Sequence, residues 1–127
     1  MENIIEAKGL TKKYPKCTAL QKVNLEIKRG EIYGLVGANG AGKTTLLKIL
    51  AGQIFQSEGE FAVFGAHEQK ELNNQRQRLG ALIENPGFYP QMTIEQNMEF
   101  YRLQKGVPGK QSVEVALKTV GLWEVRN

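Results

Sequence analysis

The sequence predicts an α/β fold, and three observations support that class. Residues 23–27 alternate apolar and polar side chains, which is the pattern of a strand with one buried face. Residues 32–36 form a continuous apolar run, which is typical of a strand buried on both faces. A glycine-rich loop at residues 37–42 then leads into a segment, residues 46–50, whose apolar side chains follow a helical period.

The N-terminal elements come from short apolar segments. Residues 3–10 predict a first strand, ahead of the strand at residues 23–27. The sequence Lys28-Arg29-Gly30-Glu31 predicts a tight turn into the strand at residues 32–36, because glycine supplies the left-handed conformation that a hairpin turn needs. We therefore expect these N-terminal strands to pair with one another.

After the loop, the sequence predicts further helices and two short strands. The helix at residues 46–50 should end at Gly52, because glycine is the preferred residue just after a helix. Thr93 and Gln96 have the spacing of a capping box, so a helix should open there and run to about Lys105. The remaining predictions are strands at residues 61–64 and 81–83, a polar helix at 68–79, a loop at 84–92 and a last helix at 112–120.

Composition excludes several classes of protein. Of the 127 residues, 41% are hydrophobic and 24% are charged, as in a globular domain. No stretch approaches the roughly 18 consecutive apolar residues of a membrane-spanning helix. The single cysteine, Cys17, cannot form an internal disulfide, and we expect a reduced thiol. All 13 acidic residues are Glu, so these residues alone cannot complete a mechanism that needs an Asp.

The net charge of +4 lies entirely at the N-terminal end. Residues 1–30 hold seven Lys or Arg and three Glu, whereas residues 31–127 hold ten of each. A basic face of this kind can attract phosphates, acidic lipid or nucleic acid. The lysines are not interleaved with the aromatic side chains that nucleic-acid grooves use. We therefore expect a solvated basic face and no nucleic-acid partner.

Residues 37–44 read GANGAGKT and match the phosphate-binding pattern G-x-x-x-x-G-K-[ST] in full. Glycines let the backbone curl so that successive N–H groups converge on phosphate oxygens, and the following helix directs its positive end at the same anion. Lys43 adds a point charge for the β- and γ-phosphates, the Thr44 hydroxyl is placed to bind Mg²⁺, and Thr45 can donate to the α-phosphate. The residues expected around the nucleotide phosphates are Gly37, Asn39, Gly40, Ala41, Gly42, Lys43, Thr44 and Thr45.

The chain resembles the N-terminal half of an ATP-binding-cassette (ABC) ATPase subunit. The resemblance rests on LTKKYP at residues 10–15, the Gly30-Glu31 turn, GANGAGKTTLLKILAG at 37–52 and GALIENPGFYPQMTIEQN at 80–97. The last block is similar to cassettes of bacterial exporters that confer bacitracin or lantibiotic resistance. The resemblance implies a partial P-loop NTPase core beside an N-terminal antiparallel β-subdomain, with ATP and Mg²⁺ as ligands. It also implies that residues 1–127 are the N-terminal part of one ATP-binding domain, without the signature motif, the Mg²⁺-binding Asp strand or the switch His.

Two residues outside the loop receive roles from the resemblance. Tyr14 matches the aromatic residue that stacks on adenine; from the residues alone, a partly buried surface Tyr is the alternative. Glu84 stands where most cassettes have a Gln that reaches toward Mg²⁺ and the γ-phosphate, so it is the candidate catalytic residue and a candidate metal ligand. An exposed loop Glu is the alternative reading of that position.

The resemblance implies a function at a membrane. We expect the ATP-binding part of a subunit that couples ATP hydrolysis to export of antimicrobial peptides or antibiotics, with a second cassette and a transmembrane permease as partners. Its expected place is cytoplasmic, at the inner face of the cell membrane. The open alternatives are a soluble ABC-type ATPase that acts on ribosomes or DNA, and a nucleotide-binding module that does not hydrolyse. The family hydrolyses ATP, but activity of this chain stays open because half of the catalytic residues are not among its residues.

Overall fold

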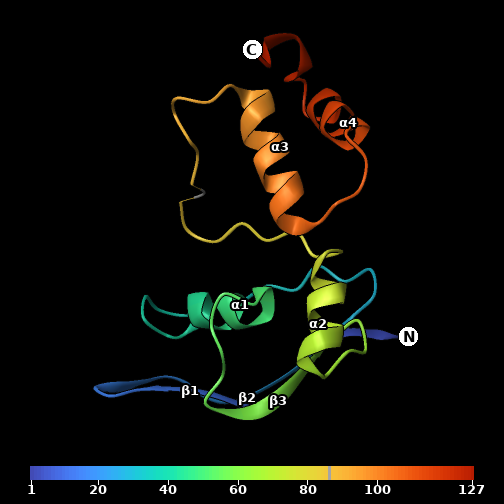
Figure 1. The fold of residues 1–127 in the computed structure, drawn as a ribbon. Helices are drawn as coiled ribbons and strands as arrows, with labels where there is room; N and C mark the ends of the chain where they lie inside the picture. Colours follow the sequence, from blue (N-terminus) through green and yellow to red (C-terminus); the bar gives the residue numbers. More distant parts are fainter. Residues whose placement is uncertain (86) are drawn as a thin grey trace. The chain divides into compact units, whose positions relative to one another are not determined.

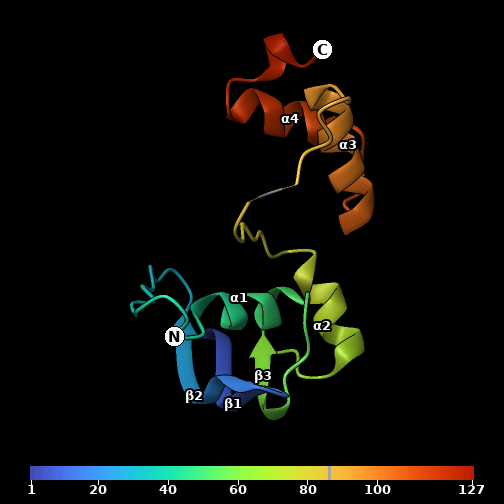
Figure 2. The ribbon, with the colours of Figure 1, turned by 90° about the vertical axis from the view of Figure 1, so that its left-hand side faces the viewer.

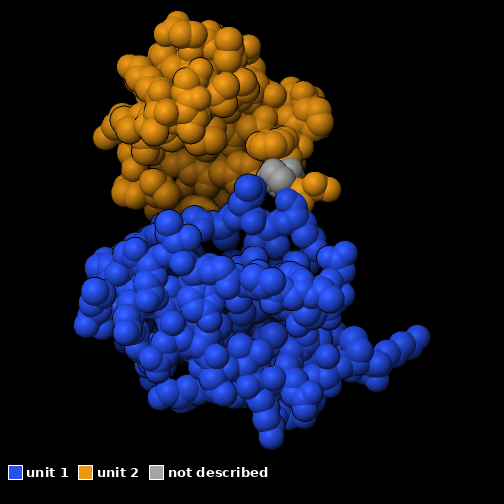
Figure 3. All heavy atoms as spheres, turned by 180° about the vertical axis from the view of Figure 1, so that it is seen from behind, with its two compact units in different colours: residues 1–84 blue, residues 85–127 orange. Residues whose placement is uncertain are grey.

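The computed structural model describes residues 1–85 and 87–127. The chain divides into two compact units, residues 1–84 and residues 85–127, which Figure 3 colours separately. Unit 1 contains the sheet and the glycine-rich loop, and unit 2 is helical.

Unit 1 is built on a three-stranded antiparallel sheet. β1 (Asn3–Tyr14) lies in the middle, with β2 (Cys17–Lys28) on one side and β3 (Glu58–Val63) on the other. Both pairings are antiparallel, and the β1–β2 hairpin stays paired up to Tyr14 and Cys17, with several shifts of register along its length. This sheet confirms the predicted strands at residues 3–10, 23–27 and 61–64 and the antiparallel subdomain.

Two helices cover one face of this sheet, α1 (Lys43–Ala51) and α2 (Gln69–Arg76), as Figures 1 and 2 both show. α1 begins directly after the glycine-rich loop and ends at Gly52, which has the left-handed conformation that the sequence predicted. Arg76 of α2 donates to the carbonyl oxygens of Leu50 (3.2 Å) and Ile49 (3.2 Å) at that end of α1, and burial lowers the pKa of Arg76. The buried side chains between the sheet and the helices are Ala7, Leu10, Leu20, Leu25, Leu46, Ile49, Leu50, Phe61, Val63, Ala66 and Leu72.

Unit 2 consists of α3 (Ile94–Lys105), α4 (Gln111–Thr119) and a short 3₁₀ turn, η1 (Trp123–Val125). α3 begins with the predicted capping box. The Thr93 hydroxyl accepts from the Gln96 N–H (3.1 Å), and the Gln96 side chain accepts from the Thr93 N–H (2.9 Å). α3 ends at Gly106, again as predicted. α4 presents Val113 and Leu117 as its buried residues.

Two predicted strands do not form. Residues 32–36 and 81–83 are irregular in the structure, and the side chains of Ile32, Val36 and Leu82 are exposed. The turn before the first of these segments is present, because Gly30 has φ +84° and the Glu31 N–H donates to the Lys28 carbonyl (3.2 Å). A strand needs a hydrogen-bonded neighbour, and all the strand pairs of the described residues use β1. These two segments therefore have the apolar composition of strands, but neither pairs with a strand of the described residues.

Candidate functional site

The loop at residues 37–42 has the curled backbone that the motif predicts. Gly40 and Gly42 have φ +85° and +96°, a region that side-chain-bearing residues rarely adopt. The Ala41 N–H donates to the Ala38 carbonyl (3.1 Å), which closes a tight turn within the loop. Residues 37–41 are exposed, so the inner face of the curl can be reached from solvent.

The Lys43 ammonium lies inside this curl. It donates to the carbonyl oxygens of Gly37 and of Ala38, the latter at 3.1 Å. A Cβ on Gly37 would lie 3.1 Å from the Ala41 Cβ and 3.8 Å from the Lys43 Nζ. The loop therefore holds the Lys43 cation close to Gly37, where a side chain would crowd Ala41, and an anion entering the curl would meet that cation.

The N-terminal end of α1 adds further positive potential. The Leu46 N–H makes an α-helical bond to the Gly42 carbonyl (2.9 Å), and the first N–H groups of a helix have no partner within it. No acidic residue lies in the first turn of α1, where a carboxylate would neutralise the helix dipole. Thr44 and Thr45 lie in that turn and are partly exposed. Free amides, a cation and two hydroxyls thus lie close together. The amides and the cation can bind phosphate oxygens, and the hydroxyl oxygens can bind a hard cation.

Gly42 packs closely against the sheet. It is buried, and a Cβ added to it would lie only 2.3 Å from the Ala19 carbonyl oxygen of β2. Ala19 lies between the residues of β2 that pair with Lys12 and Lys13 of β1. Tyr14 follows at the end of the same hairpin, so the fold brings the start of α1 and this end of the hairpin together.

Tyr14 is half-exposed, and the Lys12 Nζ lies 5.1 Å from its ring centroid. Lys13 points to a different partner, because its ammonium forms an ion pair with Glu58 at the start of β3. The hydrogen bond from Lys13 lowers the pKa of the Glu58 carboxyl. Of the two lysines beside Tyr14, one therefore covers the ring and the other is paired with an acid.

Glu84 is the last residue of unit 1, and its backbone has φ +56°. Its carboxylate Oε2 lies 3.6 Å from the Nζ of Lys48 on α1. Lys48 follows Thr44 by one helical turn, so the two side chains share a face of the helix. The structure thus brings Glu84 to the helix that follows the phosphate-binding motif, although 40 residues separate it from Thr44 in the sequence.

Asn97 is a structurally important residue that the sequence analysis did not single out. It is buried on α3, its side-chain oxygen accepts from the Tyr89 N–H (2.8 Å), and its amide donates to the Tyr89 (3.1 Å), Met92 (3.3 Å) and Thr93 (2.9 Å) carbonyls. These bonds hold the loop before α3 against the helix. No local sequence signal marks this residue, because its burial is known only from the structure.

The loop that Asn97 holds forms one wall of an apolar groove within unit 2. The groove has a volume of about 550 Å³, and α3 and α4 form its other walls. Its lining is Phe88, Tyr89, Pro90, Met92, Ile94, Asn97, Met98, Tyr101, Ala116, Leu117, Val120 and Leu122.

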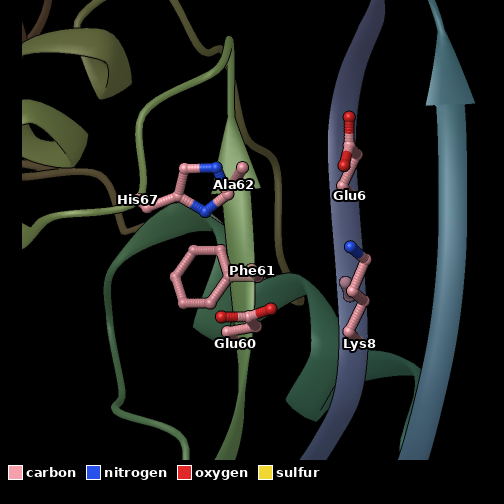
Figure 4. A pocket seen from close by; sticks show the side chains of 7 residues that line it. Glu6, Lys8, Glu60, Phe61, Ala62 and His67 are labelled. Atoms are coloured by element: carbon pink, nitrogen blue, oxygen red, sulfur yellow. The ribbon is translucent and has the colours of Figure 1, made fainter.

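A second, much smaller hollow lies on the sheet. It holds about 20 Å³, roughly one water molecule, between the neighbouring strands β1 and β3. Figure 4 shows its charged side chains Glu6, Lys8 and Glu60 on the strands and His67 from the segment after β3. Across the described residues, no three His, Cys, Asp or Glu side chains come together as a metal site.

The helices of the described part of the chain are all too short or too polar to cross a membrane.

The chain is similar to known proteins of one family. A profile of the ABC transporter family matches residues 20–127. The bacitracin transport ATP-binding proteins BcrA of Enterococcus faecalis and Bacillus licheniformis are 39% and 35% identical to this chain. Each match covers 96% of this chain but 40% of the relative, so the chain spans about two fifths of their length.

A solved structure shows the same fold. The ATP-binding cassette MJ0796, in a dimeric post-hydrolysis state bound to ADP and Pi, superposes with a TM-score of 0.80 at 26% identity, over 97% of this chain and 60% of that chain. The structural match confirms the predicted α/β class, and the profile covers the phosphate-binding loop, α1 and all of unit 2. The chain belongs to the ABC transporter family.

Proposed function

We propose that the chain binds ATP with Mg²⁺ at the curl of residues 37–44. The observation that carries this proposal is the position of the Lys43 ammonium inside a glycine-built loop at the open N-terminus of α1. A phosphate oxygen forms stronger, charge-assisted bonds with an ammonium than a neutral carbonyl does, so phosphate would displace the Gly37 and Ala38 carbonyls as partners of Lys43.

Different residues would bind the phosphates, the Mg²⁺ ion and the base of the nucleotide. The backbone N–H groups of the loop, including those of Asn39, Gly40, Ala41 and Gly42, would cradle the phosphates. The Thr44 hydroxyl and the Glu84 carboxylate are the proposed oxygen ligands of Mg²⁺, and Thr45 is the proposed donor to the α-phosphate. Tyr14 would stack on the base. The bound Mg²⁺ would neutralise charge that accumulates on the phosphate oxygens during phosphoryl transfer.

We propose further that residues 1–127 form the N-terminal part of one ATP-binding domain. The support is that the matches cover 40% of each BcrA protein and 60% of the MJ0796 cassette. In the complete protein, the domain would pair with a second cassette and act on a transmembrane permease at the inner face of the cell membrane. By analogy with the bacitracin transport proteins, the exported substrate would be a peptide antibiotic.

No nucleic-acid partner is part of this proposal. The basic hairpin end would be its contact, but Lys13 is paired with Glu58 and Lys12 lies over Tyr14. Lysines that already have partners inside the chain contribute less to the binding of a nucleic-acid backbone than lysines without partners.

The test is the affinity for ATP after Lys43→Ala. This substitution removes the side-chain cation of the curl, and a hydrogen bond to a charged group contributes about 1.5–3 kcal/mol, so affinity should fall about tenfold or more. Lys70→Ala is the matched control, because it removes the same charge from the exposed side of α2. Calorimetry that gives equal ATP affinities for Lys43→Ala and Lys70→Ala would reject the loop as the phosphate site.

A further inference from the structure

Among the described residues, the side-chain partner of Glu84 is Lys48, which lies on α1, the helix that follows the phosphate-binding loop. The Nζ of Lys48 lies 3.6 Å from the Glu84 Oε2, which is an ion pair but longer than the roughly 2.7–3.2 Å of a hydrogen bond. The Lys48 side chain is 32% exposed and that of Glu84 is 63% exposed, so water can reach the carboxylate. A carboxylate held this loosely can exchange one cation for another.

The backbone at Glu84 is also unusual. Its φ of +56° is one of three positive values at non-glycine residues of the described chain. Such a conformation is unfavourable for a residue with a side chain and persists where the surroundings hold it. Unit 2 begins with the next residue, Asn85, so Glu84 occupies the point where the chain leaves unit 1.

Lys48 and Thr44 lie one turn apart on the same face of α1. Lys48 therefore places a positive charge beside Glu84 on the face of the helix that carries the proposed Mg²⁺-binding hydroxyl. Two cations near one carboxylate repel each other, and a divalent ion prefers carboxylate oxygen as a ligand.

We infer that Lys48 competes with Mg²⁺ for the Glu84 carboxylate. In the nucleotide-free chain Lys48 is the counter-ion of Glu84, and binding of the metal with its nucleotide takes the carboxylate away from Lys48. This inference rests on the proposed function. It makes Lys48 a positioning residue that sets how strongly Mg²⁺ increases the affinity for nucleotide.

The experiment compares ATP affinities of the full chain with Mg²⁺ and with EDTA, measured by calorimetry. The ratio of the two affinities reports the contribution of the metal. In Lys48→Met the ratio should rise roughly two- to fivefold, the factor by which an exposed ion pair typically shifts an equilibrium. Lys48→Arg should leave the ratio near that of the unsubstituted chain, and so should the control Lys70→Met on α2.

The same comparison in the Glu84→Gln variant makes the test specific for the Glu84 carboxylate. In Glu84→Gln there is no carboxylate to compete for, so Lys48→Met should leave the ratio unchanged there. A thermal melt of each variant shows whether it folds, and Lys48→Gln replaces Lys48→Met if the latter does not.

Three results would overturn the inference. The first is an unchanged or lower ratio in Lys48→Met, and the second is an equally large rise in the Glu84→Gln background, which would indicate a general effect of charge. In both, ATP binding itself is intact and the proposed function stands. The third is absence of ATP binding with EDTA and with Mg²⁺, which would overturn the proposed function as well.

Discussion

Gly42 offers a quantitative test of how the phosphate-binding loop is joined to the sheet. Its φ of +96° would cost a residue with a side chain about 1–2 kcal/mol. A Cβ at this position would also lie 2.3 Å from the Ala19 carbonyl oxygen and 3.1 Å from the Leu20 Cδ1, so β2 and α1 would have to move apart. Overpacking of this kind costs about 1–3 kcal/mol more. We therefore expect Gly42→Ala to lower the free energy of unfolding by about 2–5 kcal/mol.

Gly40→Ala is the matched comparison. Gly40 has a similar φ of +85°, but a Cβ there would meet nothing within 4 Å, so only the backbone cost of about 1–2 kcal/mol applies. The effect of alanine on the unfolded chain is the same in both variants and cancels in their difference. Urea unfolding followed by circular dichroism measures the difference, which should be about 1–3 kcal/mol. Equal losses in the two variants would refute the packing of Gly42 against Ala19.

Three further predictions follow from other parts of the chain. Tyr14→Ala should weaken the binding of adenine and guanine nucleotides alike, by the roughly 1–3 kcal/mol of one stacked base, whereas Tyr14→Phe should bind them normally. An unchanged ATP affinity of Tyr14→Ala in a fluorescence titration would mean that Tyr14 is a surface residue without a role in binding. Asn97→Ala should cost about 1–3 kcal/mol in urea unfolding, because it leaves the part-buried Tyr89 N–H and Met92 carbonyl without their side-chain partner. A loss under 0.5 kcal/mol, about the size of a surface substitution, would contradict that role. The 127-residue chain should self-associate through its unpaired apolar segment, and replacing both Ile32 and Val36 with Thr should reduce its sedimentation coefficient; a monomeric unsubstituted chain would rule this out.

Local sequence signals predicted the elements that have local causes. The helix that opens at Thr93 and ends at Gly106 was predictable because its capping box and its glycine act within a few residues. The same holds for Gly52 after α1 and for the alternation in β2.

Residues 32–36 and 81–83 show where that reasoning stops. Their composition suits a buried strand, but a strand exists only beside another strand, and composition does not say whether that neighbour is present. The exposed Ile32 and Val36 are the result.

The candidate site divides in the same way. The residue types of the phosphate-binding loop were predictable, because each is needed for a local backbone or charge reason. The ion pair between Lys48 and Glu84 was not, since it joins residues 36 positions apart through the packing of unit 1. The multiple bonds of Asn97 were missed because an Asn within a polar helix gives no sign of burial.

The most direct test of nucleotide binding is a map of the backbone amides that respond to ligand. Two-dimensional NMR of the ¹⁵N-labelled chain, titrated with ATP and separately with adenosine, separates the phosphate site from any base site. We predict that ATP shifts the amide signals of residues 39–45, with Gly40 and Gly42 in the isolated glycine region of the spectrum, and that adenosine leaves them in place. Shifts confined to other residues, or equal shifts with adenosine, would contradict the assignment of this loop as the phosphate-binding site.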